Sequence, residues 1–262
     1  MNDDIYNELK ESLRLSILKY VSHKSYDSKH PLDALIPQER KIRSIVGGLE
    51  TSMGTTIWEP LAKTLAKNNG FEIISEKILI PSPMPKELAA ELAILISLRE
   101  SKLTWIPIKQ CVARLREICG KIDRSLIRGY TAPPSGTGVD IRLRKDGTEY
   151  AYDTKTVQPN LGSVKSFNKQ ILEWYAYALC KNPSLDIRCG IAYPYNPFEG
   201  NFWSHTPHTK GVLEHGVDAF VEDEFWDFLS GYKNTFGIIT KCFEELADEG
   251  FGQEISELIK KI

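Results

Sequence analysis

The chain has 262 residues, of which 42% are hydrophobic and 26% are charged, with 33 Lys and Arg against 35 Asp and Glu. This composition is typical of a globular protein with a sizeable core, and it excludes a disordered or fibrous chain. The formal net charge of −2 also excludes a polycation that coats nucleic acid through bulk charge, so an anionic partner would have to meet a local basic patch.

The first half of the chain is predicted to be mainly helical, because apolar residues recur there at helical spacing. The helices are expected over 6–21, 37–47, 49–67, 85–98 and 109–122. The third of these ends at Asn69-Gly70, which is a helix C-terminus signal, and Pro60 inside it predicts a kink or a division. Short strands are expected at 71–74 and 78–80.

The middle of the chain predicts a β-hairpin. Residues 137–144 alternate between apolar and polar side chains, Lys145-Asp146-Gly147 is a tight-turn signal, and a second strand is expected over 148–157. A helix over 163–181, a strand over 187–193 and a closing helix from about residue 240 complete the expected elements.

This order of elements predicts an α/β fold, with a mixed central sheet flanked by helices and with extra N-terminal helices. Three segments are expected to form one compact unit. They are a helical part over 1–45, a core over 46–200, and an aromatic-rich and helical part over 201–262.

The chain has five cysteines: Cys111, Cys119, Cys180, Cys189 and Cys242. Their odd number and the lack of a CxxC pair argue against a disulfide framework or a thiolate zinc site, and favour a reducing compartment. The acidic start at residues 1–4 predicts no signal peptide, and the longest apolar stretch, 88–98, is too short to span a membrane. We therefore expect a soluble, cytoplasmic protein with no membrane partner.

Positive charge is concentrated in residues 101–170. This segment, called the basic block below, contains 13 Lys and Arg against 6 Asp and Glu, whereas the remainder contains 20 against 29. A cleft that follows a phosphate backbone requires such a block. On charge alone, a solvated helix face is an equal alternative.

Asp140, Asp153 and Lys155, all within the basic block, carry the predicted chemistry. Asp153 and Lys155 are two apart on one strand, so their side chains leave the same face, and the hairpin brings Asp140 beside them. Two neighbouring carboxylates repel each other unless a cation joins them, and Mg²⁺ prefers such oxygen ligands. Lys155 can orient a water or stabilise charge on a phosphate. Together these groups predict metal-assisted displacement at phosphorus.

The spacing from Asp140 to Asp153-x-Lys155, on a hairpin between helices, resembles the PD-(D/E)xK nuclease motif, although Val139 replaces the customary proline. The resemblance implies a restriction endonuclease-like core. It also implies that Asp140, Asp153 and the backbone carbonyl of Thr154 bind Mg²⁺, for which Mn²⁺ can substitute, and that Lys155 places the attacking water.

A helix before the hairpin often supplies another carboxylate in such nucleases. Trp58-Glu59, followed by Gly70-Phe71, is similar to that Glu-bearing helix. The resemblance implies that Glu59 holds a second metal ion or a water, with Glu50 as the alternative carboxylate.

A narrower resemblance covers most of the chain and rests on PSGTGVDI (134–141), DTKTVQPN (153–160) and KSFNKQILEWY (165–175). These stretches are similar to the type II restriction endonucleases that cut GGNCC-type sites. Membership implies a bacterial homodimer that uses Mg²⁺ to cut both strands of a short palindrome in double-stranded DNA and leaves 5′-phosphates. A cognate DNA methyltransferase would be its genetic partner, and the C-terminal part would help in dimerisation or in enclosing DNA.

Several polar side chains near the catalytic strand are of the types that contact bases or phosphates. They are Arg142, Gln158, Asn160, Lys165, Asn168, Lys169 and Gln170. For each one, a helix N-cap or a solvated surface is an equal alternative. Lys169 and Gln170 are favoured, because the helix after the catalytic strand often approaches the active site in nucleases of this fold.

Two other functions stay open from the sequence. One is a repair, recombination or nicking nuclease of the same fold. The other is a non-catalytic DNA-binding module, against which the intact carboxylate and lysine trio argues. Trp174, Tyr175 and Tyr177 are predicted to be core residues rather than base-stacking ones, and His205-x-x-His208 is predicted to be an ordinary loop rather than a zinc site.

Overall fold

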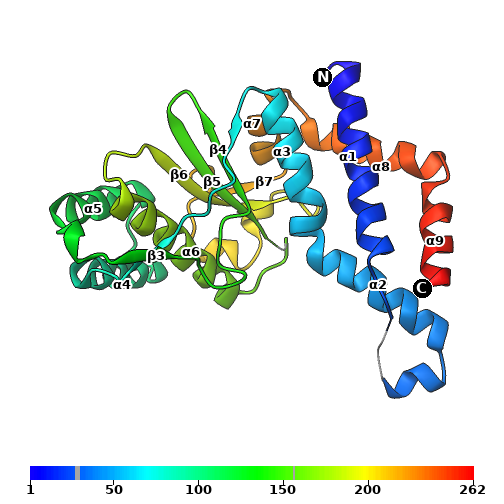
Figure 1. Ribbon diagram of the computed structural model, residues 1–262, viewed down its shortest axis with the longest axis horizontal. Coiled ribbons are helices and arrows are strands. Elements are labelled where there is room, and N and C mark those ends of the chain that lie inside the picture. The colour runs from blue at the N-terminus through cyan, green and yellow to red at the C-terminus, as the bar shows by residue number, and fades with distance from the viewer. Residues whose placement is uncertain (27–29, 156) are drawn as a thin grey trace. The chain divides into compact units, whose positions relative to one another are not determined.

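The structure is a computed structural model that describes residues 1–26, 30–155 and 157–262 (Figure 1). It divides into two compact units, one formed by residues 1–69 and 226–262 and the other by residues 70–225. The limits of these units differ from those of the three expected segments, 1–45, 46–200 and 201–262. The division into these three segments stays a prediction. The part of the predicted strand 148–157 that falls on residue 156 lies outside the described residues.

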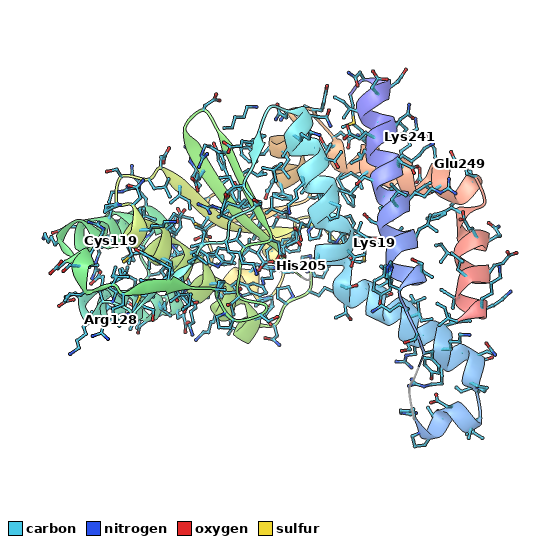
Figure 2. All side chains as sticks on the ribbon, viewed as in Figure 1. Lys19, Cys119, Arg128, His205, Lys241 and Glu249 are labelled. Carbon is cyan, nitrogen blue, oxygen red and sulfur yellow. The ribbon has the colours of Figure 1, made fainter. Side chains whose placement is uncertain are left out.

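The first unit is helical. Its helices are α1 (Asp3–Ser22), α2 (Pro37–Met53), α3 (Glu59–Asn68), α8 (Thr235–Asp248) and α9 (Phe251–Lys261), with a 3₁₀ turn η1 (Pro31–Ala34). Asn2 caps α1 by accepting a hydrogen bond from the Ile5 amide at 2.9 Å. An ion pair joins Lys10 of α1 to Glu249, which is labelled in Figure 2 and follows α8, with 2.8 Å between Nζ and Oε1.

The predicted break between the second and third helices lies later than expected. α2 continues through Gly47 and Gly48, because packing overrides the low helix propensity of glycine. This packing involves the neighbouring Ile45, which is buried and whose carbonyl accepts a hydrogen bond from the Tyr20 hydroxyl at 3.4 Å. The break comes at a π-helical turn, η2 (Gly54–Trp58), followed by Pro60 in the first turn of α3. The predicted division near Pro60 is therefore confirmed, as a change from α-helical to π-helical hydrogen bonding just before this proline.

The second unit is built on a mixed five-stranded sheet, which confirms the predicted α/β class. Its strands, in the order β1-β4-β5-β6-β7, are β1 (Glu72–Ile73), β4 (Ile141–Lys145), β5 (Thr148–Thr154), β6 (Ile187–Tyr193) and β7 (Ala219–Val221). The β1–β4 and β4–β5 pairs are antiparallel, and the β5–β6 and β6–β7 pairs are parallel. The β4–β5 turn has positive φ at Asp146 (51°) and Gly147 (82°), as an Asp-Gly hairpin turn requires.

Helices α4 (Lys86–Glu100), α5 (Ile108–Lys121) and α6 (Leu161–Lys181) pack against one another in this unit (Figure 1). Their apolar faces and Ala151 of β5 form one buried core. Because β5 and β6 are parallel, the chain must cross over between them, and α6 is that crossover. The five cysteines are free and buried; Cys119 is labelled in Figure 2.

The elements that the sequence did not predict are short. They are β2 (Ile80–Ser82) in part, β3 (Gly129–Thr131), β7, α7 (Asp223–Ser230), and the 3₁₀ turns η1, η3 (Arg124–Leu126), η4 (Phe202–Ser204) and η5 (His208–Lys210). All except α7 have only three or four residues, which is too few to show a periodicity. Among the described residues, no helix is long and apolar enough to cross a membrane.

Candidate active site

The hairpin brings Asp140, Asp153 and Lys155 together. Asp140 directly precedes β4, Asp153 is the next-to-last residue of β5, and Lys155 follows β5, where its amide donates to the Ala192 carbonyl at 2.9 Å. Lys155 Nζ forms an ion pair with Asp153 Oδ2, and the carboxyl group of Asp140 lies near enough to that of Asp153 to raise its pKa. The spacing in the sequence predicted this proximity. Their catalytic role stays a prediction.

The electrostatics of the pair are dominated by burial. Asp153 is only 4% exposed. This burial, together with the neighbouring Asp140 carboxyl, raises the pKa of Asp153 to about 8, although the Lys155 ammonium acts in the opposite direction. At neutral pH, the metal-free site therefore retains a proton that a cation would replace.

The donor set fits a hard divalent cation. Among the described residues there is no group of three or more His, Cys, Asp and Glu side chains that could hold a metal ion. Two carboxylates nevertheless suit Mg²⁺, which keeps several water ligands and is often bound through one or two carboxylates. Thr154, whose carbonyl is the predicted third ligand, ends β5; its Oγ1 is buried and has no hydrogen-bond partner among the described residues.

Lys155 is held over an aromatic ring. Its Nζ lies 5.3 Å from the centroid of Phe167, which belongs to α6 and is buried. A cation over a ring face is attracted by the ring quadrupole, and the ring also shields one side of the ammonium from water. The lysine is therefore oriented by both Asp153 and Phe167.

The loop before Asp140 is attached to α6 by two side chains. Gln170 Nε2 donates to the carbonyl of Gly136 at 3.0 Å, and Trp174 Nε1 donates to the carbonyl of Thr137 at 2.9 Å. Trp174 is buried, as predicted for a core residue. The spacing of Gln170 and Trp174 indicates this pair, because residues four apart on a helix share one face.

Of the seven predicted DNA-contact residues, four lie at the surface and three are buried or bonded to other residues of the protein. Gln158 is exposed, the Asn160 side chain caps α6, and Lys165 and Lys169 reach solvent. Lys169 is the more exposed lysine at 58%, with Nζ 3.8 Å from a carboxylate oxygen of Glu173.

The side chains of the other three are buried or bonded to other residues of the protein. Asn168 and Gln170 are buried, and Arg142 donates to Glu149 from Nη2 at 2.6 Å and to the Glu76 carbonyl from Nη1 at 2.9 Å. These contacts favour a structural role. DNA contact by any of the seven residues stays a prediction.

Glu59 and Glu50 belong to the first unit, whereas the trio belongs to the second. Glu59 lies at the start of α3 and forms an ion pair with Lys63 one turn later. The role of either glutamate at the active site stays a prediction.

Several arginines of the basic block form hydrogen bonds or ion pairs within the second unit. Arg142 and Arg144 both bind the buried carboxylate of Glu149. Arg116 Nη2 donates to the Leu185 carbonyl at 2.9 Å, and Arg124 Nε donates to the Cys180 carbonyl at 3.1 Å. These arginines join helices and strands, a role that neither interpretation of the block anticipated.

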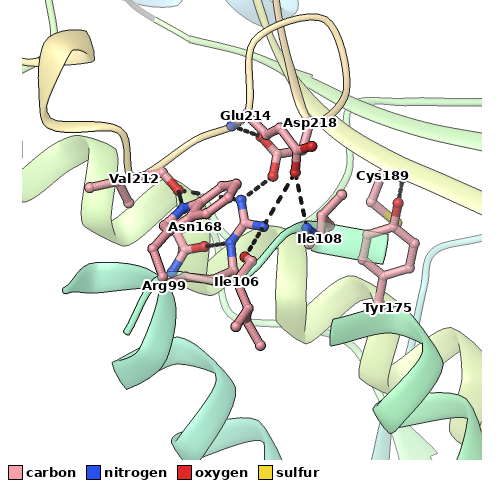
Figure 3. Close-up of polar contacts among 10 residues, drawn as sticks. Arg99, Ile106, Ile108, Asn168, Tyr175, Cys189, Val212, Glu214 and Asp218 are labelled. Atoms are coloured by element: carbon pink, nitrogen blue, oxygen red, sulfur yellow. Dashed lines mark hydrogen bonds and ion pairs between the residues drawn. The ribbon is translucent and has the colours of Figure 1, made fainter. Parts of the chain in front are cut away.

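A buried polar network centred on Arg99 was also missed (Figure 3). Its guanidinium forms an ion pair with Asp218 and donates from Nε to the Asn168 amide oxygen at 2.8 Å. Asp218 accepts in turn from the Glu214 amide at 2.6 Å, and Glu214 accepts from the Ile108 amide at 3.0 Å. The network ties α4, α5 and α6 to the segment before β7. No local sequence pattern links residues so far apart.

The histidines of the 205–208 loop pack among aromatic rings. His205, labelled in Figure 2, stacks on Phe198 with 4.0 Å between ring centroids, and His208 lies 4.4 Å from Phe202. Burial lowers the pKa of His208 to about 4, so the ring is neutral at physiological pH.

Comparison with known proteins adds two findings. A family model described as "Type II restriction endonuclease, HinfI" matches residues 1–247. The type II restriction enzyme MjaII of Methanocaldococcus jannaschii is 26% identical over 218 residues, which cover 79% of this chain and 55% of that enzyme. The chain thus spans about half the length of this relative.

Proposed function

Because the chain belongs to the HinfI family of type II restriction endonucleases, we propose that it cuts both strands of double-stranded DNA at a short palindromic site and leaves 5′-phosphates. The observation that carries this proposal is the grouping of the Asp140 and Asp153 carboxyls with Lys155, which forms an ion pair with Asp153. The proposal includes a PD-(D/E)xK core on the β4–β5 hairpin and Mg²⁺ as the cofactor. A GGNCC-type recognition sequence, a homodimer, a partner methyltransferase and a bacterial cytoplasmic setting are predictions that accompany it.

In this proposal, Asp140, Asp153 and the Thr154 carbonyl hold Mg²⁺ or Mn²⁺. Such a cation, when bound, neutralises charge on the scissile phosphate and acidifies the attacking water. Lys155, held by Asp153 and the Phe167 ring, orients the water and donates to a phosphate oxygen as its negative charge grows. Glu59, or Glu50 in its place, would hold a second cation or a water.

The test is digestion of an unmethylated plasmid with Mg²⁺, followed by sequencing of the fragment ends. Discrete fragments with one common end sequence and 5′-phosphates are expected. Random or structure-dependent cutting would support a repair, recombination or nicking nuclease instead. DNA binding without cleavage in either Mg²⁺ or Mn²⁺ would support a non-catalytic module.

Replacement of Lys169 by Ala is expected to weaken DNA binding without loss of stability. An exposed lysine that contacts phosphate releases a counterion, so the slope of log K against log salt should fall by about 1. Lys121→Ala is a matched control, because Lys121 is also an exposed helical lysine, at 70%, paired with a glutamate four residues away. Salt-dependent binding measured by fluorescence anisotropy checks the result. An equal loss in both variants would contradict a specific contact at Lys169.

A further inference from the structure

We propose that Gln170 and Trp174 of α6 are positioning residues for Asp140, through the two loop carbonyls that they hold. This inference rests on the proposed function, since it assigns the two side chains to the geometry of the same carboxylate pair. It also gives Gln170 a role other than the predicted DNA contact.

The sheet fixes the chain only after Asp140 and not before it. The β4–β5 ladder begins at Ile141, which pairs with Tyr152, so Asp140 stands just outside the hydrogen-bonded register. The chain before it is a loop, and Gly136 within that loop has a φ of 78°, a left-handed value that favours glycine. The sheet fixes one end of this short connection. Some other part of the unit must fix the other end.

The two α6 side chains supply that second attachment. The Gln170 amide and the Trp174 indole donate to the successive carbonyls of Gly136 and Thr137. Both donor side chains are buried, because Trp174 is 2% exposed and Gln170 is 6% exposed. The loop is closed on itself as well, since Thr137 donates to the Pro134 carbonyl from its amide at 3.1 Å and from its hydroxyl at 2.8 Å. The loop is thus a folded turn held from one side by α6.

The helix that holds the loop is itself fixed to the strand next to β5. The Tyr175 hydroxyl accepts from the Cys189 amide of β6 at 2.8 Å. In the parallel register, Asp153 of β5 pairs with Ile191 of β6. α6 therefore contacts both the loop before Asp140 and the strand next to Asp153, and so helps to fix the spacing of the two carboxylates. A cation shared by the two carboxylates depends on that spacing.

These bonds are expected to matter more for rate than for stability. The Gly136 backbone is exposed, so water can replace the Gln170 amide at its carbonyl. The Gln170 Oε1 is buried without a hydrogen-bond partner among the described residues, so Gln170→Met also removes a costly unpaired oxygen. In contrast, a displacement of about 1 Å at a reacting group lowers rates by about 100-fold.

The experiment compares the double variant Gln170→Met/Trp174→Phe with wild type and with Trp105→Phe. Trp105 is a matched control, because its indole also donates to a backbone carbonyl in the same unit, that of Val212 at 3.3 Å. The first readout is hydrogen exchange of the Thr137 amide in the metal-free protein, because this amide donates to the Pro134 carbonyl and is protected while the loop is folded. Exchange there should be faster by roughly tenfold or more in the double variant, from the loss of two hydrogen bonds, and unchanged in the control.

The second readout is single-turnover cleavage with Mg²⁺, alongside DNA affinity measured without metal. We expect the cleavage rate constant to fall by about 100-fold in the double variant, with DNA affinity unchanged. Unchanged exchange at Thr137 would overturn the inference, and so would a loosened loop with a normal cleavage rate. If wild type does not cleave DNA, the proposed function fails, while the exchange result still decides whether α6 positions Asp140.

Discussion

Replacement of Asp153 by Asn is expected to abolish DNA cleavage while the metal-free protein remains folded and at least as stable as wild type. The variant keeps the shape of the side chain but removes the charge that would hold a divalent cation. Loss of about 4 kcal/mol of transition-state stabilisation corresponds to a decrease of about a thousandfold in rate. Burial makes the ionised form of Asp153 costly, so the substitution removes this desolvation cost, which offsets the loss of the ion pair with Lys155.

The same substitution predicts a change in the pH dependence of stability. Because burial raises the folded-state pKa of Asp153 to about 8, well above the value of about 3.9 in an unfolded chain, its contribution to stability is full below the unfolded pKa and is lost as the pH rises through the folded pKa. Metal-free wild type should therefore lose stability between about pH 4 and pH 8 relative to Asp153→Asn.

Urea unfolding at several pH values, together with plasmid cleavage, measures both effects. Asp146→Asn is the control, since Asp146 lies exposed in the turn of the same hairpin and Asn also adopts a positive φ there readily. The control should cut DNA normally and follow the wild-type pH profile. Cleavage by Asp153→Asn at the wild-type rate would remove Asp153 from the metal site.

Replacement of Arg99 by Met is expected to destabilise the protein by about 3–5 kcal/mol. Arg99 and Asp218 are both fully enclosed, and the methionine would leave the Asp218 carboxylate without its cation. The Asn168 amide oxygen and the Val212 carbonyl would lose their donors in addition. A buried charge that loses its partner keeps its full desolvation cost.

Equilibrium urea unfolding checks this prediction, with Arg114→Met as the matched control. Arg114 also forms an ion pair, with 2.6 Å between its Nε and an oxygen of Glu91, but it is 43% exposed, so its loss should cost less than about 1 kcal/mol. The double variant Arg99→Met/Asp218→Leu should recover much of the lost stability. A small effect of Arg99→Met would mean that the enclosed pair contributes little.

The elements that the sequence predicted well have strong local signals. The strand 187–193 agrees with β6 at both ends, and the turn of the hairpin was predicted correctly because its turn residues are a local signal. The predicted strands were too long at their outer ends, since β4 begins at Ile141 instead of residue 137 and β5 ends at Thr154 instead of residue 157. The alternation of side chains along a strand placed Asp153 and Lys155 on one face, next to Asp140. These predictions needed only the period of a strand and the reversal of one turn.

The sequence did not predict which contacts the charged and polar residues of the basic block make within the fold. Arg142 binds a buried glutamate of the neighbouring strand and Gln170 binds a loop carbonyl, and contact of either with DNA stays a prediction. A side chain's chemical type states which bonds it can form. It does not state which partner lies within reach, since that depends on how segments distant in the sequence pack.

By itself, the sequence determined the α/β class, the hairpin and the grouping of two carboxylates with a lysine, because these follow from periodicity and from contacts close along the chain. Only the tertiary structure decided which distant residues surround and support those three side chains. α6, which follows Asp153 in the chain, packs back against the loop before Asp140, and Arg99 meets Asp218 across 119 positions. Such contacts depend on the packing of whole elements, which no local pattern of residues specifies.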